Sequence, residues 1–345
     1  GSSVLCLFSC FLAMRKRFSL FVPIGVTLLV LWMYDGSQSL AHNVVIAQAS
    51  LFLIPAAGFL YRDDPPASLL AVMREAPPVA CWMLGAGVCE LSPQAWDVDV
   101  RGRHGAVPVR CWGSPHRNVG LVVHVHGGGL HGGSFIAEQH VSQYLSVAAN
   151  VCSVGYRLAP EHKDPVAVDD VEDAVRVLWP SAADVRGKPR RLVLFGISAG
   201  GYLAARVALR LASTETLLVM VAPMVSPTFF GPSQHQYARA VWGHQQNAWS
   251  WRWFLGESAE TGHVDLLRAA EDGEKFPLTY VAVATRDYLR DQGVALAVSL
   301  NRTKQLVALK EWDTSHLGCK VRGFWDQCLG GARDRMIDFL RAAGT

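Results

Sequence analysis

The sequence predicts an α/β fold in which a mostly parallel central sheet is flanked by helices. From about residue 96 onward, short apolar segments alternate with amphipathic segments of helical periodicity. Apolar strands without polar alternation are typical of a parallel sheet that is covered on both faces. A serine between glycines, at the junction of one such strand and the next helix, is typical of a strand–turn–helix motif.

Six segments have the composition of buried strands, and four segments between or after them have helical periodicity. The predicted strands are 121–126, 150–156, 191–197, 216–223, 278–284 and 305–311, and the predicted helices are 167–179, 199–212, 291–302 and 331–343.

The stretch between the predicted strands 216–223 and 278–284 is too long for an ordinary connection. It contains Trp242, Trp249, Trp251, Trp253 and Phe254. We expect a helical, cap-like insertion at about 226–275. Its aromatic side chains either line an acyl pocket or bury the insertion on the sheet domain.

Length and composition fit one large domain with an added N-terminal segment. The 345 residues are 50% hydrophobic and 18% charged, and the net charge of +3 gives no reason to expect a nucleic-acid partner. The eight cysteines form no Cys-x-x-Cys pair and have no histidine at zinc spacing, so we expect neither a metal nor a cofactor. Cys81 with Cys89, and Cys319 with Cys328, are close enough for disulfides in an oxidising compartment, or they are buried thiols.

An apolar segment near the N-terminus predicts a membrane or signal-anchor region at 1–61. Phe18–Tyr34 carries no charge and follows three basic residues at 15–17. At about 1.5 Å per residue it nearly crosses a hydrocarbon core of about 30 Å. A cleaved signal peptide, with a small-residue site at 39–41, and a core helix are the alternatives.

A second apolar run, Val44–Tyr61, leaves the orientation of the remaining chain open. If it also spans, the domain at 96–345 faces the cytosol; otherwise that domain faces the lumen or is secreted. Proline pairs mark residues 62–95 as a linker. The single sequon, which begins at Asn301, is a glycosylation candidate and favours the lumen.

Ser198 is the candidate nucleophile of the chain. It stands at the centre of Gly196-Ile197-Ser198-Ala199-Gly200, between a predicted strand and a predicted helix. That context lifts a serine Oγ above the edge of a sheet, and glycines are needed because the turn is tight. A helix N-cap serine is the alternative interpretation.

A serine nucleophile needs a base that a carboxylate orients, and in this motif the chain order is Ser, then Asp or Glu, then His. His316 is the only histidine late enough in the chain. Asp287, directly after a predicted strand, is the preferred acid. Asp291 resembles a helix-capping residue, and Asp313 is too near His316 in sequence, so both rank below it.

An oxyanion needs hydrogen-bond donors that are fixed before the reaction. The glycine-rich segment after the strand 121–126 and the amide next to the nucleophile can supply them. The candidate donors are His126, Gly127, Gly128, Gly129 and Ala199. No Lys-Ser or Lys-Thr follows the glycines, which disfavours a phosphate-binding loop. The second glycine pair, at 132–133, has no explanation in this scheme.

At these residues the chain resembles the hormone-sensitive-lipase-like branch of the α/β-hydrolases, which includes arylacetamide deacetylase-like and carboxylesterase-like members. Four motifs occur in the family order, and they lie within residues 96–342. They are HGGG (126–129), YRLAPEH (156–162), GISAG (196–200) and DYLRDQG (287–293).

The resemblance implies an α/β-hydrolase fold in which Gly128, Gly129 and Ala199 supply the oxyanion amides. Glu161 would support the site without taking part in the chemistry. The chain departs from the family at Ile197, where relatives often carry an acidic residue or threonine. It also departs at His316, which stands in SHLG and not in the usual HGF context.

We therefore expect a serine carboxylic ester hydrolase that acts through an acyl-enzyme on short or medium acyl esters of apolar alcohols. An amidase, deacetylase or formamidase on the same fold is an open alternative, and so is a ligand-binding homologue without catalysis. The expected partners are a small ester or amide substrate and a membrane, reached through the N-terminal apolar segment. The anchored members of the family imply the endoplasmic reticulum.

Overall fold

The computed structural model describes residues 95–113, 120–147, 149–179, 191–240, 242–256, 265–316 and 325–342. The predicted membrane or signal-anchor region at 1–61 lies outside these ranges, as does the predicted linker at 62–95 apart from its last residue. Cys81, Cys89 and Cys319 lie outside them as well. Within the described ranges, no helix is both long and apolar enough to cross a membrane.

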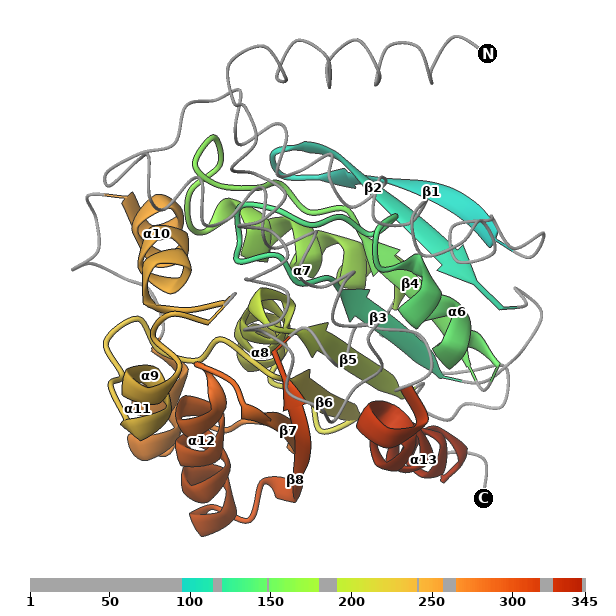
Figure 1. Ribbon diagram of the computed structural model, residues 1–345. Coiled ribbons are helices and arrows are strands. Elements are labelled where there is room, and N and C mark those ends of the chain that lie inside the picture. The colour runs from blue at the N-terminus through green and yellow to red at the C-terminus, as the bar shows by residue number, and fades with distance from the viewer. Residues whose placement is uncertain are drawn as a thin grey trace, which may run out of the picture.

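The described chain forms one eight-stranded sheet in the order β1-β2-β4-β3-β5-β6-β7-β8 (Figure 1). Its strands are β1 (Ala95–Gly102), β2 (Gly105–Trp112), β3 (Leu121–Val125), β4 (Asn150–Val154), β5 (Leu192–Ile197), β6 (Thr216–Val221), β7 (Leu278–Arg286) and β8 (Leu306–Ser315). The pairs from β4 to β8 are parallel, while β1 and β2 add two antiparallel pairings. The predicted α/β-hydrolase fold class is confirmed.

Helices cover both faces of the sheet, as expected for strands that are buried on both sides (Figure 1). One face packs against α6 (Gln139–Ser146) and α13 (Trp325–Arg341). The other packs against α7 (Val166–Leu178), α8 (Ala199–Leu211) and α12 (Arg290–Arg302). Alternate residues of a strand enter the two cores: Val123 and Val125 lie on the α8 side, and Val122 lies on the α6 side.

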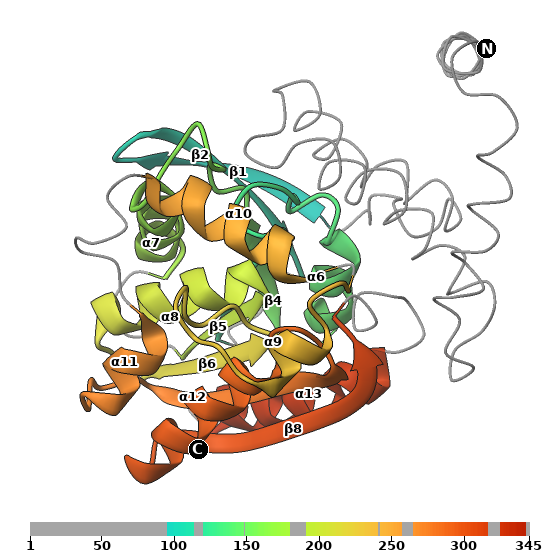
Figure 2. The ribbon, with the colours of Figure 1, turned by 60° about the vertical axis from the view of Figure 1, so that its left-hand side comes forward.

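The connection from β6 to β7 contains three helices, α9 (Pro232–Gln236), α10 (His244–Leu255) and α11 (Leu266–Glu271). The buried apolar residues of α10 and α11 belong to the core on the α8 side, and Figure 2 shows the three helices in yellow to orange. Trp251 of α10 meets Tyr202 of α8 edge-on, with ring centroids 4.9 Å apart. The aromatic residues of this segment therefore bury it on the sheet domain, which was one of the two interpretations of the tryptophan-rich stretch.

Two features differ from the sequence expectation. The hairpin β1–β2 extends the sheet on the N-terminal side, where no strand was predicted; its polar residues alternate because one face is exposed. The last strand, β8, continues to Ser315 and does not end near residue 311. His316 therefore directly follows the strand, and Asp313 lies inside it.

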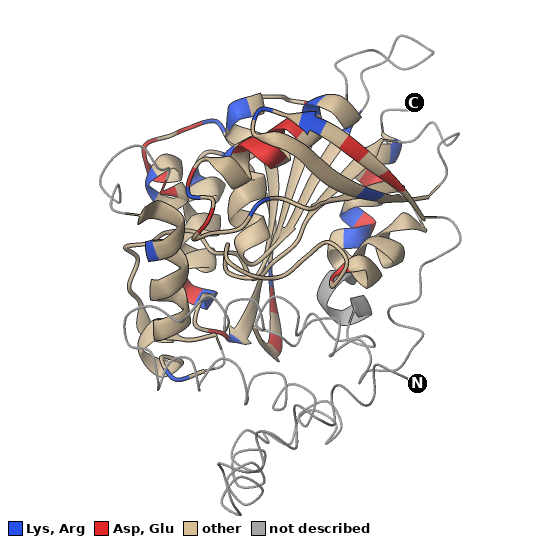
Figure 3. Ribbon diagram, turned by 90° about the horizontal axis from the view of Figure 1, so that it is seen from above, with Lys and Arg blue, Asp and Glu red and all other residues tan. Residues whose placement is uncertain are grey.

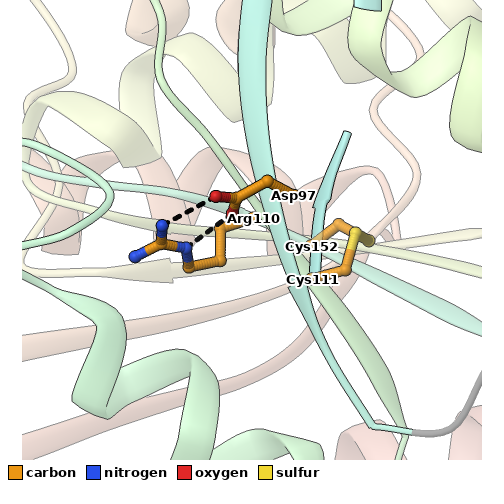
Figure 4. The surroundings of a disulfide bond; sticks show 4 residues. All are labelled: Asp97, Arg110, Cys111 and Cys152. Atoms are coloured by element: carbon orange, nitrogen blue, oxygen red, sulfur yellow. Dashed lines mark hydrogen bonds and ion pairs between the residues drawn. A yellow bond between two sulfur atoms is a disulfide. The ribbon is translucent and has the colours of Figure 1, made fainter. Parts of the chain in front are cut away.

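A disulfide joins Cys111 of β2 to Cys152 of β4 (Figure 4). The two residues are direct partners in the antiparallel register, and both are buried. Nearby, Arg110 forms two hydrogen bonds to Asp97 across the hairpin (Figure 4). Sequence spacing did not indicate this cysteine pair, because the residues are 41 positions apart and only the strand register brings them together.

Candidate active site

The turn between β5 and α8 presents Ser198 in a conformation that few non-glycine residues adopt. Its φ is 56° and its ψ is −119°, and its side chain makes no capping hydrogen bond to α8. Gly196 and Gly200 approach so closely that a Cβ on Gly196 would lie against the Gly200 carbonyl. This is the strained strand–turn–helix geometry that a nucleophilic serine requires, and it excludes a simple N-cap role.

Ser198, His316 and Asp287 form one hydrogen-bonded chain at the carboxyl ends of β5, β7 and β8. Ser198 Oγ lies 3.0 Å from His316 Nε2, and His316 Nδ1 lies 2.8 Å from Asp287 Oδ2. A carboxylate only accepts, so Nδ1 carries the proton and Nε2 is free to accept from the serine hydroxyl. All three residues are buried. The arrangement can move a proton from Ser198 to His316.

The Asp287 carboxylate is also held from its own side, since its Oδ1 accepts from the amide of Leu289 at 3.0 Å. The two rival carboxylates lie elsewhere. Asp291 accepts from the amide of Ser233 and pairs with Arg290, while Asp313 is exposed and accepts from Thr285.

The glycine segment 126–133 folds back on itself beside the nucleophile turn. The amide of Gly132 donates to the Gly128 carbonyl at 2.9 Å, and a Cβ on Gly133 would collide with the Gly127 carbonyl. Gly128 and Gly129 have φ values of 127° and 65°. Of the second glycine pair, unexplained by the sequence, Gly133 is therefore needed to close the loop against the first pair, and Gly132 contributes its amide.

The loop contacts the nucleophile turn directly. A Cβ on Gly200 would lie against the carbonyl oxygens of Val125 and His126, the latter at 2.5 Å. Within the described part of the chain, the amides of Gly128 and Gly129 donate to no other residue. The Gly127 amide, in contrast, donates to Glu138 Oε2 at 3.2 Å. Gly128 and Gly129 are therefore better placed than Gly127 to bind an oxyanion.

The YRLAPEH motif supports this loop from behind. Tyr156 stacks on His126 with ring centroids 4.2 Å apart, and its hydroxyl donates to the His126 carbonyl at 2.8 Å. Burial, with the nearby carboxylate of Glu138, raises the pKa of Tyr156 well above its ordinary value, so the hydroxyl remains a donor. The amide of Ala159 donates to the Leu130 carbonyl at 2.9 Å.

Other predicted positions lie apart from this hydrogen-bonded chain. Glu161 is exposed in the turn that follows Pro160, and its supporting role stays a prediction. Asn301 is exposed near the end of α12. Among the described residues, no group of three or more histidine, cysteine or carboxylate side chains is arranged to hold a metal ion.

Three buried side chains near the site were not among the predicted catalytic or oxyanion residues: Glu138, His131 and Trp242. Trp242 stacks on the imidazole of His316, with centroids 5.6 Å apart and planes inclined by 22°. The imidazole of His131 lies against the Gly129 carbonyl, with Nδ1 at 2.7 Å from its oxygen. The run His131-Gly132-Gly133 was a sequence signal for one of them, whereas the position of Trp242 depends on how the insertion packs.

A comparison with known protein families matches residues 122–319 to the α/β-hydrolase fold family. The motifs and the site geometry agree with this match. The chain belongs to this family. Within it, the relatives place the chain in the hormone-sensitive-lipase-like branch with esterase homologues.

The curated relatives that the chain resembles include an arylesterase and an ethyl acetate hydrolase. An arylesterase of Saccharolobus solfataricus is 32% identical over 213 residues, which cover 59% of this chain and 70% of the arylesterase. An ethyl acetate hydrolase of Pseudomonas putida is 32% identical over 235 residues, which cover 62% of this chain and 71% of that enzyme. These likenesses support a serine ester hydrolase of the carboxylesterase type.

A solved structure, the hyperthermophilic esterase of Pyrobaculum calidifontis, superposes with a TM-score of 0.69. It is 24% identical, and the superposition covers 84% of this chain and 98% of the esterase. At this identity the likeness shows the fold.

Proposed function

We propose that the protein hydrolyses carboxylic esters through an acyl-enzyme formed on Ser198. The observation that carries the proposal is the contact of 3.0 Å between Ser198 Oγ and His316 Nε2, with Asp287 behind the imidazole. A serine hydroxyl reacts readily only when a base accepts its proton, and a carboxylate that fixes the tautomer keeps that base ready.

In the proposed reaction, Ser198 Oγ attacks the acyl carbon while its proton moves to His316 Nε2. The amides of Gly128, Gly129 and Ala199 stabilise the oxyanion. The carbon–oxygen bond to the alcohol then breaks, and the alcohol takes the proton from His316. Water attacks the acyl-enzyme by the same route and returns the proton to Ser198 as the acid leaves.

The proposed substrates are short or medium acyl esters of apolar alcohols. The aromatic face of Trp242 against His316, and the apolar packing of α10 beside it, support a site for apolar groups. A panel of p-nitrophenyl esters with increasing acyl length, together with phenyl acetate and acetanilide, tests both the length and the ester-versus-amide preference. Faster hydrolysis of acetanilide than of phenyl acetate would contradict the ester assignment and favour the amidase alternative.

The role of Asp287 has a matched test in the rival carboxylate Asp313. Asp287→Asn keeps the shape but donates toward His316 Nδ1, which moves the ring proton to the side of Ser198. We expect kcat to fall by about 10⁴-fold in a folded protein, whereas Asp313→Asn retains kcat within about twofold. Equal losses in the two variants, or full activity of Asp287→Asn, would remove Asp287 from the mechanism.

We further propose that the hydrolase domain folds in an oxidising compartment. The buried Cys111–Cys152 disulfide supports this, since such bonds persist where thiols are not kept reduced. The exposure of Asn301 supports it too, because a glycan needs a surface position. The N-terminal anchor stays a prediction on residues outside the described ranges.

The compartment is tested on the full chain in eukaryotic cells. We expect Cys111 and Cys152 to resist alkylation until a reductant is added. We also expect glycosidase treatment to shift the wild type but not Asn301→Gln. Alkylation of both thiols without reductant, together with no glycosidase shift, would contradict the proposal.

A further inference from the structure

His131, a histidine outside the proposed reaction, is buried between the glycine loop and the insertion. Its Nδ1 lies 2.7 Å from the Gly129 carbonyl and 3.2 Å from Ser250 Oγ of α10. The carbonyl can only accept, so Nδ1 carries the proton and donates. Ser250 Oγ donates its own proton to the Gln246 carbonyl at 2.8 Å, which leaves it an acceptor toward His131.

The hydrogen bond of His131 adds to one already present in the loop. The peptide unit between Gly128 and Gly129 is oriented by Gly132, whose amide donates to the Gly128 carbonyl. Because the peptide is trans, this bond points the Gly129 amide the other way. His131 holds the next peptide unit through the Gly129 carbonyl, so both sides of Gly129 are fixed.

Trp242 and helix α10 of the insertion pack against Gly129 as well. A Cβ on Gly129 would lie against Trp242, 2.7 Å from Ser250 Oγ and 2.9 Å from the His131 ring. The Trp242 ring is nearly parallel to both imidazoles, with interplanar angles of 17° to His131 and 22° to His316. Trp253 of α10 meets His131 edge-on at 4.9 Å.

We propose that His131 is a positioning residue through which helix α10 holds the oxyanion loop in register with Ser198. The inference rests on the proposed ester hydrolysis. Oxyanion donors accelerate acyl transfer because they are oriented before charge develops. Gly129 has no side chain of its own, so its backbone is oriented by two hydrogen bonds, from Gly132 on one side and from His131 on the other. His131 acts through Gly129 and does not touch the substrate.

Two substitutions separate the hydrogen bond of His131 from its bulk. His131→Asn keeps a donor near the position of Nδ1 and loses the ring, whereas His131→Phe keeps a ring and loses the donor. We expect His131→Phe to lower kcat on p-nitrophenyl butyrate about 10-fold, a fraction of the effect of losing a donor outright, with KM within about twofold. His131→Asn should retain kcat within about threefold, because its amide still donates.

A boronic acid that forms a tetrahedral adduct with Ser198 gives a second readout. Its adduct carries the anionic oxygen, so its inhibition constant should rise in His131→Phe by about the same factor by which kcat/KM falls. Ser250→Ala should give a change of about threefold in the same direction, because His131 Nδ1 loses its contact with α10. Ser146→Ala is the matched control: Ser146 Oγ also donates to a carbonyl of its own helix, that of Gln143, but in α6. It should leave both constants unchanged.

Melting temperatures separate positioning from loss of fold. Wild-type kcat and boronate affinity in His131→Phe would overturn the inference while leaving the esterase proposal intact. Equal losses of kcat in His131→Asn and His131→Phe would also overturn the inference, since the donor that His131→Asn retains would then not contribute to kcat. A folded wild type that hydrolyses no ester and binds no boronate would overturn the proposed function, and this inference with it.

Discussion

The nucleophile turn at 196–200 and the glycine loop at 126–133 lie at the ends of neighbouring parallel strands, β5 and β3, and are held in different ways. The nucleophile turn is shaped by its own backbone, in which Gly196 and Gly200 approach without side chains between them. The glycine loop depends on side-chain hydrogen bonds: Glu138 accepts from the Gly127 amide, Tyr156 donates to the His126 carbonyl, and His131, within the loop itself, donates to the Gly129 carbonyl.

The two loops therefore differ in how much of their support can be recognised in the sequence. The nucleophile turn is formed by its own glycines, which make a short sequence motif. The turn at Ser198 could therefore be predicted from five residues and their position between a strand and a helix. In the glycine loop, the sequence motif shows the glycines but not the side chains that support them, such as Glu138 and Tyr156. Its supporting residues can be identified only after the chain has folded.

The comparison predicts the largest effect in the nucleophile turn. Gly200→Ala places a Cβ against the carbonyls of Val125 and His126, where backbone and not a flexible side chain must move. We expect esterase activity to fall by more than about 10³-fold, since Ser198 and the loop would separate. Kinetics on p-nitrophenyl butyrate, with circular dichroism to verify folding, measure this.

Gly132→Ala is the control for that substitution, because a Cβ there meets only the Gly128 carbonyl at 3.4 Å, an ordinary contact. It should retain most of the activity. If the two variants lost activity equally, the close approach at Gly200 would not be the reason for its glycine.

A smaller effect is expected where a remote side chain supports the loop. Glu138 accepts from the Gly127 amide and lies 3.5 Å from His124 Nε2. Glu138→Ala leaves a buried amide without its acceptor, and we expect kcat to fall by about 10- to 100-fold. Glu138→Gln keeps an acceptor and should recover most of the loss. A Glu138→Ala enzyme as active as the wild type would show that the loop holds itself.

The fold and the site differ in how far the sequence determines them. The parallel strands were predictable because each is a continuous apolar run. The positions of Asp287 and His316 at neighbouring strand ends were predictable because each follows such a run in the expected order, while their catalytic roles stay predictions. The β1–β2 hairpin was missed because its polar residues alternate along exposed strands. Trp242 was recognised as part of an aromatic insertion, but only the packing of the insertion brings its ring to His316.

A cluster of ion pairs outside both loops provides the contrast in which stability changes and catalysis does not. Where the β1–β2 hairpin meets α7, Arg103 and Arg210 both pair with Asp169 and Glu172. Figure 3 shows acidic and basic residues interspersed around this part of the molecule. Burial alone would raise the pKa values of Asp169 and Glu172. Hydrogen bonds from His104 and Arg210 instead hold the pKa of Asp169 below its ordinary range. A hydrogen bond from Arg103 does the same for Glu172.

The lowered pKa values give the sign of a pH dependence. Carboxylates with depressed folded-state pKa values stabilise the fold above their ordinary pKa of about 4, and this stability is lost as the pH falls through the depressed values. We expect Arg210→Ala to lower the free energy of unfolding by about 1 to 2 kcal/mol at pH 7. The deficit should shrink as the pH falls below about 4, with kcat unchanged at pH 7.

Arg268→Ala is the control, since Arg268 and Asp272 form a pair of exposed side chains. Such a pair contributes less than about 1 kcal/mol. Urea unfolding of the two variants at pH 7 and pH 3.5 gives the comparison. An Arg210→Ala deficit that stays constant down to pH 3.5 would contradict the role given to the two carboxylates.

The most direct test of Ser198 as the nucleophile is to locate the site of covalent modification by a fluorophosphonate, by peptide mass mapping of the folded protein. We expect one adduct per chain, on the peptide that carries Ser198, and none in Ser198→Ala. An adduct on another residue, or a folded wild type that remains unmodified, would contradict Ser198 as the nucleophile.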